Sequence, residues 1–161
     1  MFVFPTVSRR AVVIVTGGST PAGRDIAREL AGWAWAIVVA YLDHQRRVEA
    51  TVAEIISAGG TTVAVRVNLA DDLDVQRLYA ESIAAFGGVD VVVHTTTEPT
   101  SLLYRHAARQ VRERGAIVSV AAAERIAPEV ARQLHEHGIT VGRAPSEALL
   151  SILARWRQGI G

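Results

Sequence analysis

Short apolar runs alternate with amphipathic stretches along the whole chain. Six runs rich in β-branched residues have the length and composition of buried strands, at residues 11–16, 36–41, 62–67, 89–94, 116–120 and 139–142. Because nearly every position in these runs is apolar, both faces of the predicted sheet are expected to be covered by helices. Their alternation with helical segments favours parallel strands. The pattern therefore predicts an α/β protein with a three-layer α/β/α, doubly wound sheet.

Apolar residues at helical spacing fill the gaps between these runs. Residues 48–56 and 75–86 each carry a single apolar stripe and are followed by two glycines, one of which can adopt the left-handed conformation that ends a helix. Asp71 or Asp72 is expected to cap the second stripe. Proline favours the first turn of a helix. Further helices are predicted over residues 101–114, from Pro128 and from Pro145.

Length and composition narrow the class of protein. A chain of 161 residues is expected to form a single domain, residues 1–161. The formal net charge is +1, with acidic and basic side chains interleaved, which argues against a nucleic-acid surface. The absence of cysteine excludes disulfides and thiolate metal sites. Residues His135 and His137 point to different faces of a short helix, so no metal site is predicted.

The apolar runs are too short to span a bilayer, so no membrane partner is expected. The apolar segment 1–5 is followed by Arg9 and Arg10, which is the reverse of the order in a secretory signal. A chain without cysteine also fits a reducing compartment. The expected location is cytoplasmic.

A glycine-rich turn follows the first predicted strand. The segment Thr16-Gly17-Gly18-Ser19-Thr20-Pro21-Ala22-Gly23 leads into a helical stretch with Ile26 and Leu30 on one face. In such a turn, backbone N–H groups approach a pyrophosphate and the helix dipole favours its charge. The alternative is a tight strand–helix connection that binds no ligand. The position of the turn, at the start of a βαβ series, favours a nucleotide site.

This turn resembles the T-G-x-x-x-G-x-G fingerprint of the short-chain dehydrogenase/reductases. Residues 49–60, 85–93, 115–120 and 138–145 are similar to further segments of that family. The resemblance implies a Rossmann-like sheet of strand order 3-2-1-4-5-6 and NAD(P)-dependent oxidoreductase activity. It also implies that a nicotinamide dinucleotide contacts Gly17, Ser19, Thr20, Ala22, Gly23, Tyr41, Asn68, Leu69, His94 and Thr95.

Three departures from the family pattern affect this site. Pro21 stands where the family has its second glycine, so one N–H is lost and ring atoms are added near the phosphates. Asn68 replaces an aspartate, but its carbonyl can still accept a hydrogen bond from the adenine amine. The family's Asn-Asn-Ala-Gly becomes His94-Thr95-Thr96-Thr97, which keeps polar groups and loses the flexible glycine.

The family's catalytic serine, tyrosine and lysine are all missing. The position of the serine is taken by Ala122, no tyrosine follows Arg114, and the chain contains no lysine. Reduction of a ketone needs a proton donor, and a tyrosine serves near neutral pH only beside a cation that lowers its pKa. We therefore predict no catalytic residue, and a shortened dehydrogenase-like protein that keeps a nucleotide site without the usual chemistry.

The sequence leaves the choice between NAD and NADP open. Asp43 would hold the ribose diol of NAD, whereas Arg46 and Arg47 would hold the 2′-phosphate of NADP. The predicted second strand ends at Tyr41, and the absence of an acidic residue there favours NADP.

Two other classes of function compete with this one. An enzyme of unrelated chemistry would use His94 as a base and Ser119 as a nucleophile, both near the carboxyl ends of neighbouring strands. A non-catalytic interaction protein would pair with itself, as a homodimer, or with a longer relative. Trp33 and Trp35 would then form a partner surface, although they are equally expected in the core.

Overall fold

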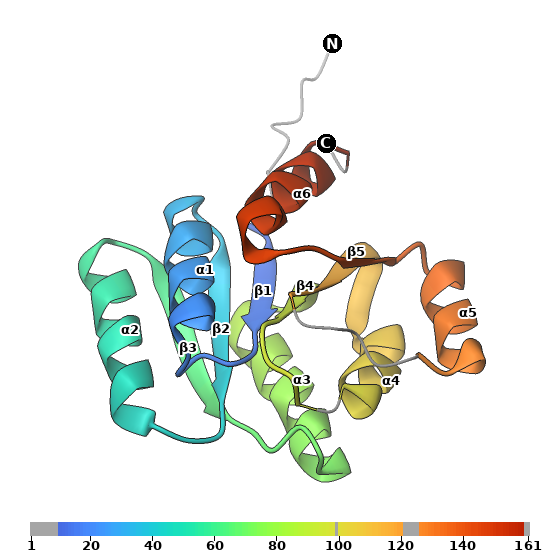
Figure 1. The fold of residues 1–161 in the computed structure, drawn as a ribbon, viewed down its shortest axis with the longest axis horizontal. Coiled ribbons are helices and arrows are strands. Elements are labelled where there is room, and N and C mark those ends of the chain that lie inside the picture. Colours follow the sequence, from blue (N-terminus) through green and yellow to red (C-terminus); the bar gives the residue numbers. More distant parts are fainter. Residues whose placement is uncertain (1–9, 99, 121–125, 160–161) are drawn as a thin grey trace.

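The structure is a computed structural model that describes residues 10–98, 100–120 and 126–159. Its centre is a sheet of parallel strands in the order β3-β2-β1-β4-β5-β6 (Figure 1). This order confirms the predicted Rossmann-like topology. The strands are β1 (Val12–Val15), β2 (Ala36–Tyr41), β3 (Thr61–Arg66), β4 (Val89–His94), β5 (Val111–Ser119) and β6 (Thr140–Arg143).

Helices cover both faces of the sheet, as its apolar strands require. On one face Ile26, Val48 and Leu149 join the core from α1, α2 and α6, and on the other Leu78 and Leu103 join it from α3 and α4. The three-layer prediction is therefore confirmed. The helices are α1 (Pro21–Gly32), α2 (Gln45–Ser57), α3 (Asp72–Phe86), α4 (Ser101–Gln110), α5 (Pro128–Glu136) and α6 (Ser146–Gly159).

Local capping explains where two of the helices begin and end. Thr20 accepts a hydrogen bond from the N–H of Gly23 and caps α1, with Pro21 in the first turn. Asp71 caps α3 by accepting from the N–H of Asp74, and α3 ends at Gly87, which has a φ of +86°. Asp71, and not Asp72, is the capping residue.

The predicted helix over residues 101–114 is wrong at its end. The helix stops at Gln110, and β5 begins at Val111. Between Val111 and Ala116 β5 bulges away from the register of β4, and Arg114 has a φ of +64°. Tertiary contacts hold this bulge: the Arg114 N–H donates to the carbonyl of His137 over 3.0 Å, and its own carbonyl accepts from Trp156 Nε1 over 2.9 Å. Contacts between distant residues override the local helical pattern.

Candidate functional site

The glycine turn lies at the carboxyl end of β1 and folds tightly onto itself. Gly17 has a φ of +65°, which favours glycine. Thr20 Oγ1 donates to the carbonyl of Gly17 over 2.7 Å and accepts from the N–H of Gly23 over 3.1 Å. The Gly18 N–H donates to the carbonyl of Ala40 over 3.0 Å, so the turn is also attached to the end of β2. These bonds fix the backbone of the turn before any ligand arrives.

Some amide groups of the turn remain available to an anion. Within residues 10–98, 100–120 and 126–159, the N–H groups of Gly17, Ser19 and Ala22 make no hydrogen bond. Pro21 has no N–H, but it occupies an exposed position at the start of α1. The turn therefore keeps the donors that phosphate binding at a helix N-terminus requires.

A small cavity of about 120 Å³, here called the turn cavity, is lined by Gly17 and Ser19, two of the residues with unbonded N–H groups. Five of the predicted cofactor residues line it: Gly17, Ser19, Thr20, Tyr41 and Leu69. The turn thus faces the ends of β2 and β3, as a nucleotide site at a topological switch point requires. Thr16 and Thr96, which belong to the motifs but were not among the predicted contacts, also line the turn cavity. The sequence did not single out the other lining residues, which are Ala40, Leu42, His44, Val67 and Glu98.

A second hollow of about 470 Å³, the α1–α2 groove, shares Ser19 and Thr20 as lining residues with the turn cavity. Arg47 of α2 lines it, and within the described residues its guanidinium makes no ion pair or hydrogen bond. Arg24 lines the groove too, but it donates to Glu54 over 2.8 Å. Arg46 lines neither hollow. The structure thus distinguishes two adjacent arginines that the sequence could not separate.

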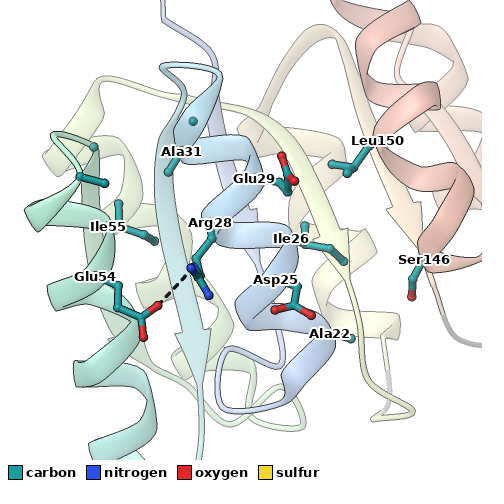
Figure 2. A pocket seen from close by; sticks show the side chains of 13 residues that line it. Ala22, Asp25, Ile26, Arg28, Glu29, Ala31, Glu54, Ile55, Ser146 and Leu150 are labelled. Carbon is teal, nitrogen blue, oxygen red and sulfur yellow. Dashed lines mark ion pairs between the residues drawn. The ribbon is translucent and has the colours of Figure 1, made fainter.

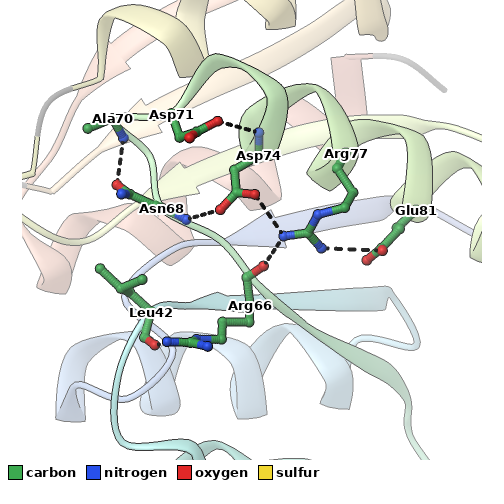
Figure 3. A network of polar contacts seen from close by, with 8 residues as sticks. All are labelled: Leu42, Arg66, Asn68, Ala70, Asp71, Asp74, Arg77 and Glu81. Carbon is green, nitrogen blue, oxygen red and sulfur yellow. Dashed lines mark hydrogen bonds and ion pairs between the residues drawn. The ribbon is translucent and has the colours of Figure 1, made fainter.

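Asn68 does not line the turn cavity, although its neighbours Val67 and Leu69 do. Its side-chain Oδ1 accepts from the N–H of Ala70 over 3.0 Å, which closes a local turn. Its own N–H donates to Asp74 Oδ2 over 2.9 Å (Figure 3). The predicted contact of Asn68 with adenine therefore has no support in this arrangement.

Asp74 is the centre of a polar network that holds the β3–α3 connection (Figure 3). The N–H of Asn68 holds the pKa of the Asp74 carboxyl below its usual value; the partial burial of the carboxyl opposes this shift, and Arg77 adds to it. Arg77 reaches across to the carbonyl of Arg66 over 2.6 Å and pairs with Asp74 over 3.3 Å. This network positions the segment that carries Leu69 into the turn cavity.

His94 and Thr95 support the turn. His94 is 1% exposed; its Nδ1 lies 2.8 Å from Thr16 Oγ1 and its Nε2 lies 3.3 Å from the carbonyl oxygen of Glu98. Thr95 Oγ1 donates to the carbonyl of Thr16 over 2.7 Å, and the Thr95 N–H donates to Thr16 Oγ1 over 3.2 Å. These bonds connect the end of β4 to the glycine turn, so His94 acts on the site by positioning it.

Gly23 and Ala22 are the last two of the predicted cofactor contacts. Gly23 is buried against the carbonyl of Gly17, so it serves the shape of the turn. Ala22 lines a different hollow of about 910 Å³ that flanks α1 and is bordered by α2 and α6 (Figure 2). There Arg28 Nε lies 3.2 Å from Glu54 Oε2. This hollow lies among the helices, and none of the other predicted residues lines it.

The alternative pair His94 and Ser119 is brought together and buried. The two residues are opposite each other in the register of β4 and β5, and each is 1% exposed. Ser119 is hydrogen-bonded to the side chain of Tyr104. Both side chains are thus closed to solvent in this arrangement, and the enzyme of unrelated chemistry stays a prediction. Ala122 lies outside the described residues.

The tyrosines that are buried do not become better acids. Burial raises the pKa of Tyr104, and its hydrogen bond with Ser119 offsets only part of this shift. Burial also raises the pKa of Tyr79, whose hydroxyl donates to the carbonyl of Leu103 over 2.9 Å. Both shifts have the wrong direction for a proton donor near neutral pH.

The tryptophans form one cluster. Trp35 is buried, and its ring makes edge-to-face contacts with Trp33 at 5.3 Å and Trp156 at 5.9 Å between ring centroids. Core packing accounts for Trp35, while Trp33 stays partly exposed.

In the described part of the chain, no group of three or more His, Cys, Asp or Glu side chains gathers as a metal site would need. No helix there is long and apolar enough to cross a bilayer.

Comparison with known proteins assigns the glycine turn and the strands around it to a family. Residues 11–111 match the family model described as short chain dehydrogenase. The 3-oxoacyl-[acyl-carrier-protein] reductase of Staphylococcus aureus is 36% identical over 81 residues, which cover 50% of this chain and 33% of that protein. The reductase of the same name from Synechocystis is 36% identical over 94 residues, or 57% of this chain and 38% of that protein. The matched segment thus spans about a third of each relative's length.

Solved structures share the arrangement of strands and helices. A short-chain dehydrogenase/reductase from Serratia marcescens superimposes with a TM-score of 0.69 at 22% identity, covering 84% of this chain and 73% of that one. A short chain dehydrogenase from Burkholderia cenocepacia, solved in complex with NADP, gives a TM-score of 0.66 at 24% identity with the same coverage. These likenesses show the fold. With the family match extending from β1 to the start of β5, the chain belongs to the short-chain dehydrogenase family.

Proposed function

We propose that this protein binds NADP at the glycine turn and does not carry out the carbonyl reduction that its family fold suggests. The observation that carries the proposal is the pair of unbonded N–H groups on Gly17 and Ser19 beside the turn cavity, followed by the unbonded N–H of Ala22 in the first turn of α1. A pyrophosphate would take these donors, and the dipole of α1 would favour its charge. The Burkholderia cenocepacia neighbour solved with NADP supports this choice of ligand class.

Arg47 supports NADP over NAD. It lines the α1–α2 groove next to Ser19 and Thr20, and its charge has no partner among the described residues. A 2′-phosphate would supply that partner through charge-assisted hydrogen bonds. Asp43, which lines the turn cavity, is the competing group, since it would accept from the ribose diol of NAD.

The absence of turnover follows from the missing proton donor. When bound, the nicotinamide supplies a hydride, but an alkoxide also needs a proton. The chain has no lysine to lower the pKa of a tyrosine, and Tyr79 and Tyr104 are buried with raised pKa values. Tyr41 lines the turn cavity, but it has no lysine beside it as the family's tyrosine does.

A calorimetric titration of the full chain with NADPH and with NADH tests the binding. We expect saturable binding of both, tighter for NADPH, together with a rise in melting temperature as ligand is added. No heat and no stabilisation at millimolar nucleotide would refute the proposal and favour the non-catalytic interaction protein. NADPH mixed with a panel of ketones should show no loss of nicotinamide absorbance above the buffer rate. Turnover at rates usual for the family would contradict the second half of the proposal.

A further inference from the structure

We infer that the site holds only the adenosine half of NADP, so that its ligand class is an adenosine 2′-phosphate 5′-diphosphate. This inference rests on the proposed function. A doubly wound sheet binds its two mononucleotide halves on opposite sides of the switch point, one over β1–β2–β3 and one over β4–β5–β6. In this chain the two sides differ.

The side of β2 and β3 is open. The turn cavity reaches from Ser19 to the ends of these strands, and apolar side chains such as Leu69 and Val67 line it beside Tyr41. An adenine ring needs such a surface of mixed aromatic and aliphatic groups. The α1–α2 groove with Arg47 joins this side. Base, phosphates and 2′-phosphate can therefore be held by contiguous parts of the site.

The side of β4 is filled next to the turn. The side chains of Thr95 and Thr96 pack so closely on Gly17 that a Cβ at Gly17 would overlap Thr95 Oγ1 and lie 2.5 Å from Thr96 Cγ2. Thr95 is held there by its two hydrogen bonds to Thr16. Thr96 thus bounds the turn cavity from the β4 side, and Thr95 lies behind it, between the turn and the end of β4.

Beyond these threonines, side chains occupy the ends of β4 and β5. His94 and Ser119 are each 1% exposed and are hydrogen-bonded to neighbours, His94 to Thr16 and Ser119 to Tyr104. A nicotinamide ribose that approached here would meet packed side chains whose polar atoms are already engaged. Displacing them would break hydrogen bonds that a neutral ring does not replace.

Thr96 offers a variant with little structural cost. Its Oγ1 is buried and makes no hydrogen bond among the described residues, so removing it breaks none. Thr96→Ala also deletes the Cγ2 that lies against Gly17. The adjacent Thr97 is exposed and does not line the turn cavity, which makes Thr97→Ala the matched control.

Titration of the full chain with three ligands tests the inference: NADP, adenosine 2′-phosphate 5′-diphosphate and nicotinamide mononucleotide. We expect the first two to bind with Kd values within about threefold of each other and the third to give no saturable heat. If NADP binds more than about thirtyfold tighter than the adenosine compound, or if the mononucleotide saturates, the inference is wrong while the proposed function stands. If neither NADP nor the adenosine compound binds, the inference and the proposed function are both wrong.

The two threonine variants test the inference independently of this ligand comparison. In Thr96→Ala the preference for NADP over the adenosine compound should rise by about tenfold, because space opens toward β4. In Thr97→Ala the ratio should stay that of the unmodified chain. Should Thr96→Ala fold poorly, Thr96→Ser removes the same methyl group and keeps the hydroxyl. An unchanged ratio in a folded Thr96 variant would overturn the inference.

Discussion

Gly23 has no room for a side chain, because a Cβ there would overlap the carbonyl oxygen of Gly17. Gly32, at the other end of α1, has no atom within 4 Å of the same position. We expect Gly23→Ala to lower the free energy of unfolding by about 1–3 kcal/mol through overpacking. Gly32→Ala should raise it by up to about 1 kcal/mol, because alanine costs less backbone entropy. Urea denaturation of both variants checks this, and equal changes would contradict it.

Arg47 and Arg46 carry the same charge on the same turn of α2, but only Arg47 lines the α1–α2 groove. Arg47→Ala should weaken NADP binding by about tenfold, the loss of one partly exposed charged contact to the 2′-phosphate. NAD binding should not change. Arg46→Ala is the control and should leave both Kd values as they are. Equal losses for the two variants would mean that the 2′-phosphate is attracted by general charge and not held by Arg47.

The buried carboxylate of Asp90 adds side-chain hydrogen bonds between β4 and its neighbours. Asp90 Oδ2 accepts from the N–H of Val12 over 2.8 Å and from Arg112 Nη1 over 3.0 Å, so it connects β1, β4 and the bulge of β5. Asp90→Ala would remove the acceptor of Arg112 Nη1 and of the Val12 N–H, while Arg112 Nη2 would keep its bond to the carbonyl of Gly87. We expect it to lower the free energy of unfolding by about 3 kcal/mol. Thermal unfolding measures this, with Glu113→Ala, which is exposed on the same bulge, as control.

The β3–α3 connection should be sensitive to acid. The folded pKa of Asp74 lies below its ordinary value of 3.8, mainly because its carboxylate accepts from the N–H of Asn68. A lowered folded pKa contributes stability that is complete above the unfolded pKa and is lost as pH falls through the folded one. Asp74→Ala should therefore melt lower than the unmodified chain at pH 7, with a difference that narrows below about pH 3.8. Asp25→Asn, an exposed acid on α1, should show no such convergence.

Helix α6 is attached to the rest of the molecule through the tryptophan cluster. Trp156 contacts Trp35 edge to face and donates from Nε1 to the carbonyl of Arg114 over 2.9 Å. Trp156→Ala should lower the free energy of unfolding by about 2 kcal/mol, less than for a fully buried ring. Because all the tryptophans of the chain lie in this cluster, emission should shift to the red as Trp35 becomes wetter. Arg157→Ala, its exposed neighbour, should move neither quantity.

The order of strands and helices was predictable because it depends on patterns that repeat along the chain. Continuous apolar runs indicate strands buried on both faces, and period-3.6 spacing indicates helices. Thr20 and Asp71 mark helix starts by bonds within a few residues, and Pro21 by its fixed φ. The segment 111–115 was not predictable in this way. Its conformation depends on hydrogen bonds with Asp90, His137 and Trp156, which are distant in sequence.

For the candidate site too, some features follow from the sequence and others depend on tertiary packing. That the chain carries a glycine turn after its first strand, and has no lysine and no tyrosine after Arg114, follows from the order of residues alone, since no folding adds a chemical group. Packing alone decided which of two arginines lines the groove and that Asn68 does not line the turn cavity. It also decided that His94 and Ser119 are buried. Side-chain direction and access to solvent depend on neighbours brought from other strands, and a linear pattern does not contain them.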